Sequence, residues 1–342
     1  MKFSRIYFLL LLSASPVFVA GQHAFVRGQR PGFFLLIHPS ARATGMAYAL
    51  TAAADDATAN YYNSAGLAFS KTPSVSTSYL GYLTALRPDM HYSYLGISYP
   101  MVSSAWGFDL TFVTLGETEV RDSLGQYTGT ALVWRIAPKL SYAQRVIEHL
   151  SLGISWKFIY HKFMWDFGFM PELGWVNEDT RSWAFDFSLQ YRPLQNLAIG
   201  AVVHNIGPDF NYESSGATDP LPRLTRLGIA YVPVDTKNIE CTISCELSKL
   251  LVGLFRYENN TFWQNLKCEF DTARKGVGLE IVFFKMLSLR AGYVYDNTDC
   301  LQGLTFGGGV QYKNLRLDIG TDEIVYDFST QNRTITASYR FD

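Results

Sequence analysis

Residues 183–191 read WAFDFSLQY, a stretch in which the character of the side chains alternates strictly. The odd positions carry large apolar side chains, and the even positions carry Ala184, Asp186, Ser188 and Gln190. Successive side chains of a β-strand point to opposite faces of its sheet, so this pattern predicts a strand with one apolar and one polar face. The segments 150–160, 277–283, 287–295, 304–312 and 335–341 alternate in the same way, which predicts an all-β chain from residue 73 onward.

We predict fourteen antiparallel strands, most of them near ten residues long, which is the length of a tilted strand that spans a membrane. They cover 73–83, 91–100, 104–114, 136–146, 150–161, 182–192, 196–206, 225–232, 238–248, 276–284, 287–296, 303–313, 314–320 and 334–341.

Charged residues are segregated between the two faces of these strands. In the eleven strands with clear alternation the apolar faces carry none, whereas the opposite faces carry seven acids and seven bases: Asp109, Lys157, Asp186, Arg192, Arg226, Glu240, Glu246, Glu280, Arg290, Asp296, Lys313, Arg316, Asp318 and Arg340. A Lys or Arg that faces lipid at the membrane midplane costs about 2–4 kcal/mol, so a membrane would enforce this segregation. Balanced charges on the other face can pair inside a narrow lumen, which favours a transmembrane β-barrel.

The lengths of the connections support the barrel. Short turns alternate with longer connections, and four of these are very long: 115–135, 162–181, 207–224 and 249–275. Outer-membrane barrels place short turns in the periplasm and long loops outside, so both termini are expected in the periplasm. The alternative is a soluble periplasmic β-sandwich, which predicts neither this alternation nor the tyrosines near strand ends, Tyr160, Tyr191, Tyr231, Tyr295, Tyr312 and Tyr339.

The N-terminus has the pattern of a secretory signal peptide. Lys2 and Arg5 precede an apolar run at 6–12, and small residues at 19–21 resemble a cleavage site. That run is shorter than the roughly 20 residues that span a bilayer as a helix. We therefore expect a signal peptide at 1–21, an N-terminal plug or periplasmic segment at 22–72 and a barrel in the bacterial outer membrane at 73–342.

Residues 22–72 lack strand alternation and are rich in Ala and Gly. Ser40 is a candidate cap for a short helix through Ala41, Arg42 and Ala43, and Asp55 and Asp56 are candidate caps for another that ends near Asn63. The apolar run at 33–37 argues against a disordered leader. Glycines on the lumenal faces, among them Gly278, Gly292 and Gly307, would leave room for this segment or for a ligand.

No enzyme signature is present. The chain lacks a G-x-S-x-G elbow and an H-E-x-x-H pair, and its six histidines lie outside metal-ligand spacing of one another. His161 and His204 are interpreted as members of a lumenal polar network. We therefore expect no catalytic residue, no cofactor and no metal, and a net charge of −1 gives no basic surplus for nucleic acid.

Two features fall in the expected extracellular loops. Cys268 and Cys300 flank neighbouring predicted strands at the same rim, so they either form a disulfide or remain two free thiols. The loop 249–275 carries the aromatic residues Phe255, Tyr257, Phe262 and Trp263. Exposed rings of this kind often anchor a partner, and the alternative is that the loop folds over the barrel mouth.

The N-terminal segment resembles a known family. The stretch 33–46, which contains Ser40, Ala41, Arg42, Gly45 and Met46, and the stretch 53–68, which contains Asp55, Asp56, Asn63, Gly66 and Leu67, are similar to the "SARA-GMG", "A-DDA" and "WNPAGLA" segments of the PorV/PorQ family. The likeness continues in 150–157, 197–207 and 287–293. Ser64 replaces the usual Pro, and Ala47 replaces the second Gly of the first motif, so the local backbone is expected to differ.

This family comprises outer-membrane proteins of the type IX secretion system, distant cousins of FadL-type long-chain fatty-acid transporters. The resemblance implies a fourteen-stranded FadL-like barrel with an N-terminal plug. It implies protein partners, namely a secretion translocon, a sortase or secreted cargo, or else a hydrophobic small-molecule ligand of a FadL-like channel. We expect a non-enzymatic secretion component that binds cargo or partner subunits through extracellular loops, with the channel as the alternative.

Overall fold

The structure is a computed structural model that describes residues 31–82, 84, 88–121, 124–166, 175–177, 179–211, 218–251, 261–298, 301–325 and 332–341. The expected signal peptide therefore lies outside the described residues. Among them, no helix has the length and apolar character needed to cross a membrane.

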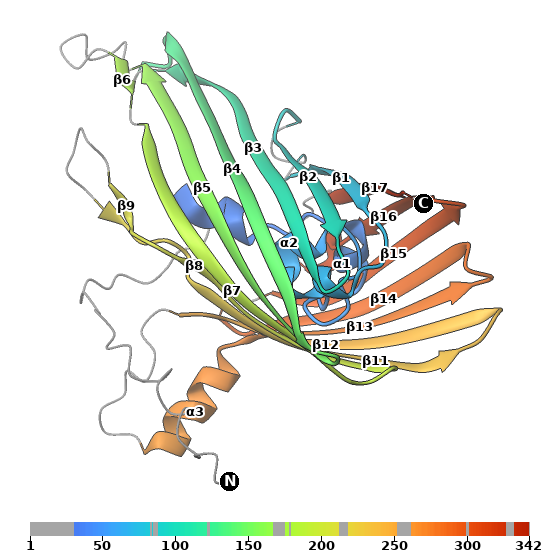
Figure 1. Cartoon of the computed structure of the whole chain (residues 1–342). Coiled ribbons are helices and arrows are strands. Elements are labelled where there is room, and N and C mark those ends of the chain that lie inside the picture. The colour runs from blue at the N-terminus through green and yellow to red at the C-terminus, as the bar shows by residue number, and fades with distance from the viewer. Residues whose placement is uncertain are drawn as a thin grey trace.

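Fourteen strands of the described chain form a closed antiparallel barrel, as predicted (Figure 1). Each strand pairs with its neighbours along the chain, and β1 closes the ring by pairing with β17. The strands are β1 (Ser74–Gly81), β2 (His91–Pro100), β3 (Ser104–Arg121), β4 (Tyr127–Ile147), β5 (Leu150–Asp166), β7 (Thr180–Leu194), β8 (Leu197–Ile206), β11 (Leu224–Asp235), β12 (Ile239–Leu250), β13 (Arg274–Phe283), β14 (Leu287–Asp296), β15 (Leu301–Tyr312), β16 (Leu315–Thr321) and β17 (Arg333–Arg340).

One side of the barrel wall is much taller than the sequence pattern indicated. The prediction of a long loop at 115–135 is wrong, because β3 continues to Arg121 and β4 begins at Tyr127. The expected loop at 162–181 is likewise partly strand, since β5 extends to Asp166 and β6 (Trp175–Asn177) pairs with its end. These extensions project beyond the rest of the wall (Figure 1). Large apolar and polar side chains do not alternate at 115–121 and 127–131, although strand pairing continues there.

The connections at the opposite end are short, as predicted, for example Glu148–His149 between β4 and β5. Short turns mark the periplasmic end of an outer-membrane barrel. On the extracellular side the small strands β9 (Phe210–Asn211) and β10 (Thr218–Asp219) pair with each other, and α3 (Phe262–Asp271) precedes β13. The short helix η3 (Glu323–Val325) follows β16.

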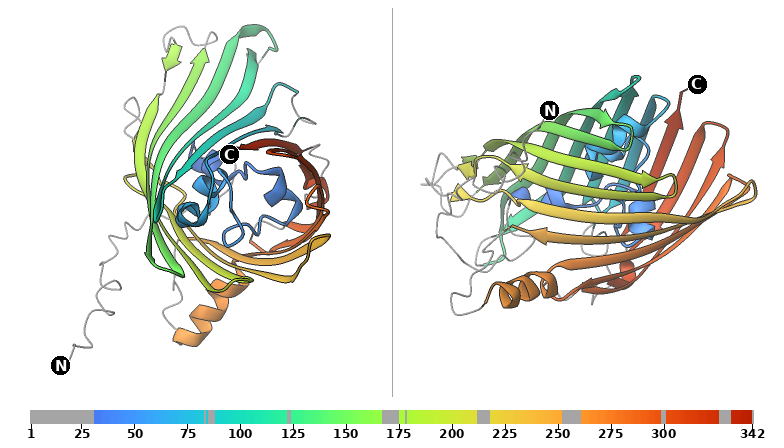
Figure 2. Two further views of the ribbon diagram at one scale, coloured as in Figure 1. Left: turned by 45° about the vertical axis from the view of Figure 1, so that its right-hand side comes forward. Right: turned by 60° about the horizontal axis from the view of Figure 1, so that its bottom comes forward.

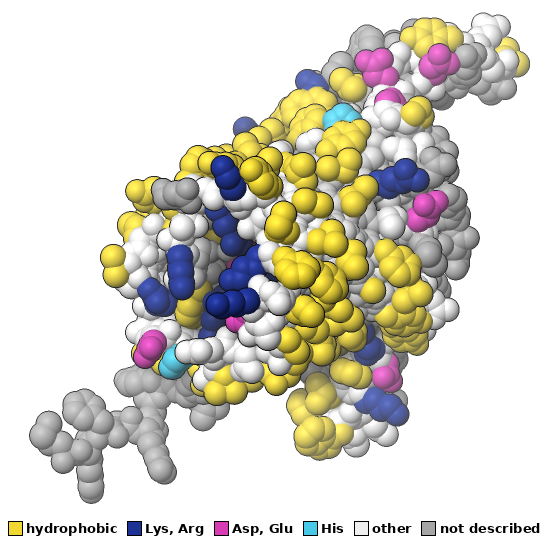
Figure 3. Space-filling model, turned by 90° about the vertical axis from the view of Figure 1, so that its right-hand side faces the viewer, with side chains coloured by type: hydrophobic (Ala, Val, Ile, Leu, Met, Phe, Trp, Pro, Cys, Tyr) yellow, Lys and Arg dark blue, Asp and Glu magenta, His cyan; other side chains and the backbone are white. Residues whose placement is uncertain are grey.

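The two faces of the wall have the predicted chemistry. Leu289 in β14 is 51% exposed on the outer face, whereas its neighbour Arg290 is 4% exposed and points into the lumen. Apolar side chains cover much of the outer surface, and Lys and Arg gather in the hollow at the periplasmic mouth (Figure 3). The exposed apolar surface is therefore the lipid-facing belt of the barrel.

The segment before β1 fills the ring of strands (Figure 2). It consists of η1 (Pro31–Leu36), α1 (Ala41–Gly45), α2 (Ala59–Tyr62) and η2 (Ser64–Phe69), and we call residues 31–72 the plug. Lumenal glycines allow the plug backbone to touch the wall. A Cβ atom at Gly278 would lie 2.5 Å from the carbonyl oxygen of Met46, and one at Gly320 would lie 2.4 Å from that of Ala41.

The expected helix caps are only partly correct. Ser40 is the N-cap of α1, but its side chain makes no capping hydrogen bond. The second helix ends at Tyr62 with Asn63 as its C-cap, yet its N-cap is Thr58 rather than Asp55 or Asp56. Asp56 instead accepts hydrogen bonds from the backbone N–H and the hydroxyl of Thr58, at 2.8 and 2.5 Å. Asp55 forms an ion pair with Arg42.

Candidate functional site

The motif residue Arg42 joins the plug to the barrel wall. Its Nη2 atom lies 2.6 Å from Oε2 of Glu280 in β13, and its Nη1 atom lies 2.7 Å from Oδ1 of Asp55, which belongs to the second motif. Arg290 and Arg316 reach Oε1 of the same Glu280 at 2.7 and 3.0 Å. Three guanidinium groups from the plug, β14 and β16 therefore converge on one buried carboxylate.

Further acids balance these cations. Asp318 lies 2.9 Å from both Arg290 and Arg316, and Arg340 at the end of β17 lies 3.4 Å from the half-exposed Asp55. Burial alone would lower the pKa of the Arg42 guanidinium, but Glu280 and Asp55 outweigh it and hold that pKa well above its usual value. We call Arg42, Asp55, Glu280, Arg290, Arg316 and Asp318 the plug latch.

Hydrogen bonds attach the rest of the plug around the ring. Glu246 in β12 accepts from the backbone N–H groups of Leu50 and Thr51 at 3.1 and 3.0 Å. The Asn63 side chain of the third motif donates to Oε1 of Gln190 in β7 at 2.7 Å. Gly66 approaches Ala54, where an added Cβ would lie 3.0 Å from the carbonyl oxygen, and Leu67 is fully buried. Ala41, Gly45 and Met46 are also buried in the lumen.

The two departures from the family motifs have visible consequences. The hydroxyl of Ser64, which replaces the usual Pro, lies 2.8 Å from the hydroxyl of Ser188 in β7. Ala47, which replaces a Gly, has a φ of +54° and is followed by Tyr48 at +66°. This left-handed backbone favours glycine, so the Gly of the family motif would adopt it without the strain that Ala47 bears. Tyr48 donates to Asp322 at 2.5 Å, and burial raises the pKa of that carboxyl despite the hydrogen bond.

A second cluster of charged side chains lies in the lumen, separate from the plug latch. Asp186 in β7 lies 2.9 Å from Lys157 Nζ and 3.2 Å from Nδ1 of His204, which places His204 in a polar network as predicted. Lys139 in β4 lies 3.1 Å from Asp109 and donates to the carbonyl oxygen of Asn60 in the plug at 2.6 Å. We call Asp109, Lys139, Lys157, Asp186 and His204 the mid-lumen cluster.

Sequence reasoning missed Lys139. The segment 136–146 contains Pro138 and no clean run of alternation, so its charges were not assigned to a face. The pattern of Leu140 and Tyr142 against Lys139, Ser141 and Ala143 would have revealed it. Leu140 is exposed on the outer face and Lys139 is buried, so this strand follows the same rule as its neighbours.

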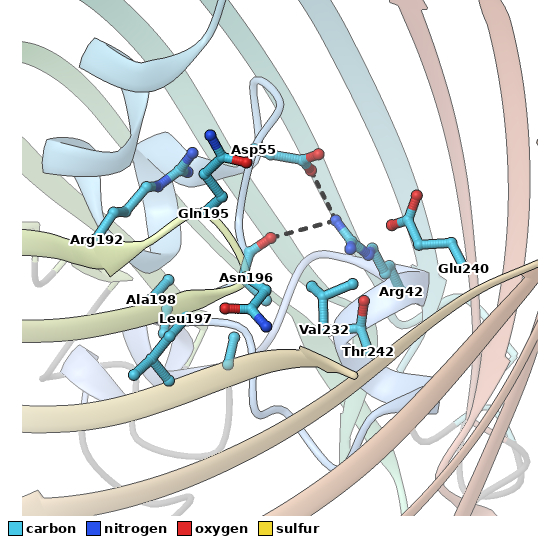
Figure 4. Close-up of a pocket in the computed structure, with 13 residues that line it drawn as sticks. Arg42, Asp55, Arg192, Gln195, Asn196, Leu197, Ala198, Val232, Glu240 and Thr242 are labelled. Carbon is cyan, nitrogen blue, oxygen red and sulfur yellow. Dashed lines mark hydrogen bonds and ion pairs between the residues drawn. The ribbon is translucent and has the colours of Figure 1, made fainter. Parts of the chain in front are cut away.

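The latch borders a polar cavity of about 160 Å³ at the periplasmic end (Figure 4). Arg42 and Asp55 of the plug point toward each other on one side of it. Arg192, Gln195 and Asn196 come from the end of β7 and its turn, and the Arg192 guanidinium lies 4.4 Å from the centre of the Phe69 ring. Glu240 adds a second acid, so the lining has two arginines and two acids and suits a small polar molecule rather than an apolar one.

Nearer the mid-lumen cluster, a cavity of about 10 Å³ is bounded by Leu35, Tyr61, Lys139, Lys157 and Arg226, among others. That volume is at the lower limit for one water molecule. The plug therefore leaves little free space beside these charges.

The candidate residues of the extracellular loops lie apart from the lumen. Phe262 and Trp263 are exposed on α3, which sits outside the ring of strands (Figure 2). Phe255 and Tyr257 lie outside the described residues. Cys268 lies in α3 and forms no disulfide with a described cysteine, and Cys300 lies outside the described residues, so their pairing stays a prediction. Within the described part of the chain, no group of three His, Cys, Asp or Glu side chains could hold a metal ion.

Residues 26–171, less than half of the chain, match the model of the family described as Type IX secretion system protein PorV, which confirms the resemblance seen in the sequence. This range contains all three plug motifs. No protein of curated function matches the chain.

Solved structures share its fold at low sequence identity. The Pseudomonas putida toluene transporter TodX superposes with a TM-score of 0.55 at 12% identity, covering 87% of this chain and 97% of its own. A Pseudomonas aeruginosa FadL homologue gives 0.56 at 12%, covering 89% and 98%. The Ralstonia pickettii toluene transporter TbuX gives 0.53 at 13%, covering 87% and 98%.

The closed fourteen-stranded ring, its apolar outer belt and these comparisons agree with one another. The chain is therefore an outer-membrane β-barrel with the FadL-like fold, and its N-terminal part resembles the PorV family of the type IX secretion system.

Proposed function

We propose that this protein is a non-enzymatic outer-membrane component of protein secretion, similar to PorV, that binds cargo or partner subunits through its extracellular side. The match of residues 26–171 to the PorV family supports this function. The match includes the plug and the taller part of the wall formed by β3, β4 and β5, so it covers the features in which this barrel departs from a simple pore.

The single observation that carries the proposal is the filled lumen. Arg42 and Glu280 pair at 2.6 Å across the boundary between plug and wall, and Lys139 holds the plug backbone at Asn60. A barrel occluded by buried ion pairs suits a docking function better than a transport function, because moving the plug would leave charges unpaired in a closed space.

The tall wall offers a surface for a partner. Leu124 and Tyr127 are 81% and 59% exposed at the tip of the hairpin between β3 and β4. β3 extends about 23 Å from Thr114 to its end at Arg121, at the usual rise of a strand, so Leu124 and Tyr127 stand beyond the lipid-facing belt. Exposed apolar and aromatic side chains in such a place are typical of protein contacts. Phe255 and Tyr257 of the 249–275 loop, which lie outside the described residues, remain a second predicted contact.

The test is purification of a tagged copy from its native outer membrane in mild detergent, with mass spectrometry of the proteins that co-elute. We expect a large translocon barrel, a sortase or proteins that share a C-terminal domain. Leu124→Asp combined with Tyr127→Asp should reduce their recovery. Val102→Asp is the matched control, because Val102 is 91% exposed in the periplasmic turn between β2 and β3.

A second candidate function is a channel for long-chain fatty acids or other hydrophobic small molecules. The FadL-like fold, shared with two toluene transporters, favours it. Uptake of labelled toluene or oleate into proteoliposomes distinguishes the two functions. We expect no uptake above that of protein-free liposomes. Recovery of a lone barrel with bound apolar ligands, together with rapid uptake, would contradict the secretion function and support the channel.

A further inference from the structure

Helix α3 is a well-formed amphipathic helix at the extracellular end of the barrel. A capping box begins it: the Thr261 hydroxyl accepts from the backbone N–H of Gln264 at 3.3 Å, and the Gln264 side chain accepts from the backbone N–H of Thr261 at 2.8 Å. This reciprocal pair satisfies two groups that the first turn leaves open. The capping box therefore fixes Thr261 as the start of the helix.

Its large apolar side chains share one face. Residues 262, 263, 266 and 270 fall within an arc of about 100° at 3.6 residues per turn. They are Phe262, Trp263, Leu266 and Phe270, with exposed fractions of 62, 74, 42 and 54%. The exposed Lys267 borders this arc on one side, and the partly buried Glu269 and the buried Asn265 follow it on the other side, which faces the barrel.

The helix is attached to the barrel at the upper edge of the lipid-facing belt. Lys275 belongs to the same outward column of β13 as Val277 and Leu279, both of which are exposed to lipid. Its ammonium group lies 4.6 Å from the centre of the Phe270 ring and 5.5 Å from that of Tyr295, the residue opposite it in β14. A salt bridge of 3.0 Å between Lys249 and Glu269 holds the helix to β12.

We infer that α3 lies in the outer surface of the membrane, with its apolar arc among the acyl chains and Lys267 and Lys275 at the level of the headgroups. The apolar arc continues the lipid-facing belt through Phe270, Lys275 and Tyr295. Tyrosine and lysine at this height are the residues that anchor a barrel at the membrane interface. A helix with aromatic residues on one face and lysine beside it has the composition of an interfacial helix.

This inference rests on the outer-membrane location and is independent of the secretion function. It assigns Phe262 and Trp263 to lipid, whereas the sequence had suggested a protein partner or closure of the barrel mouth. Closure does not fit, because α3 lies outside the ring of strands (Figures 1 and 2). The experiment must distinguish this contact with lipid from docking of a protein on the same arc.

The experiment measures quenching of tryptophan fluorescence in liposomes of brominated phosphatidylcholine. The full chain and the Trp263→Phe variant are reconstituted with bromines placed either near the ester groups or near the chain ends. The difference between the two proteins isolates Trp263. We expect this difference signal to be blue-shifted and to be quenched more strongly by the shallow bromines. Trp156→Phe is the reference, since Trp156 is 46% exposed on the outer face of β5.

Two further variants distinguish loss of membrane contact from failure of the helix to form. Gln264→Ala removes the capping-box side chain but none of the apolar arc, so any loss of quenching reports helix order. Leu266→Ser retains the cap and interrupts the arc, and it should lower the quenching of Trp263 by about twofold. The inference would be overturned if neither the shallow nor the deep bromines quenched the Trp263 signal of the wild-type protein. Shielding of Trp263 from the bromines only in the native complex would assign the arc to a protein.

Discussion

Arg42 in the plug donates hydrogen bonds to both carboxylate oxygens of Glu280 in β13, across a sequence separation of 238 residues. The pair is buried, and Arg290 and Arg316 share the same carboxylate. A motif residue of the N-terminal segment therefore has its partner in a strand near the C-terminal end of the chain. The stability of the plug and that of the wall are coupled through this contact.

The first prediction concerns this coupling. Arg42→Ala should destabilise the protein by about 3 kcal/mol, at the lower end of the range for breaking a buried pair, because Glu280 retains two other cations. In a double-mutant cycle with Glu280→Gln, we expect a coupling energy of about 1–3 kcal/mol. Urea unfolding in detergent, followed by tryptophan fluorescence, measures both values.

Arg340→Ala is the control for that cycle. Arg340 is 43% exposed and lies 3.4 Å from Asp55, so its loss should cost less than about 1 kcal/mol. Additive effects of Arg42→Ala and Glu280→Gln would show that the latch does not couple the plug to the wall.

The second prediction concerns the close contact of plug and wall. Gly278→Ala places a methyl group 2.5 Å from the Met46 carbonyl oxygen, so the plug must shift. We expect ion conductance in planar bilayers, where the wild-type protein stays closed. Gly308→Ala is matched in chemistry, but its nearest atom lies at 3.7 Å, so that variant should remain closed. Equal conductance of the two variants would contradict this explanation.

The third prediction addresses the mid-lumen cluster. Asp186→Asn removes the acid that faces Lys157, Lys139 and His204, which leaves two buried lysines with Asp109 as their remaining cluster acid. We expect a loss of about 3–5 kcal/mol in urea unfolding. Adding Lys157→Met should recover part of this loss, because it removes the uncompensated charge. A double variant less stable than Asp186→Asn would argue against charge imbalance as the cause.

The fourth prediction tests the assignment of the lipid-facing belt. Ile229 is 51% exposed near the middle of β11, and Val234 is 40% exposed near its periplasmic end. Ile229→Arg should cost about 2–4 kcal/mol and Val234→Arg about 0–1 kcal/mol, because the penalty falls with distance from the membrane midplane. Refolding equilibria in lipid vesicles provide the comparison. Equal costs of the two substitutions would show that the lipid-facing belt has been assigned to the wrong height on the barrel.

The fifth prediction concerns Cys268 and Cys300. If loops beside neighbouring strands bring them together in the oxidising environment outside the cell, the intact mass should rise on reduction by two hydrogen atoms. Cys268→Ser should abolish that change. Alkylation of both thiols without a reductant would exclude the disulfide.

The local sequence predicted all fourteen strands because lipid acts on every residue of one face in the same way. A strand such as 183–191 therefore carries its orientation in its own composition. Alternation marks only the part of a strand that faces lipid. At 115–121 and 127–131 large apolar and polar side chains do not alternate, so the extension of β3 and β4 could not be read from alternation.

By itself, the sequence determined the class of fold, the lumenal side of most charges in the clearly alternating strands and the presence of an N-terminal segment with the PorV-like motifs. Only the tertiary structure decided that Arg42 meets Glu280, that Lys139 joins Asp109, and that α3 lies against Lys275 outside the barrel. The physical reason is that burial of a side chain depends on its own polarity and position, whereas its partner depends on strand register, on the curvature of the wall and on the path of the plug. Those are properties of the whole ring, and no short stretch of the chain contains them.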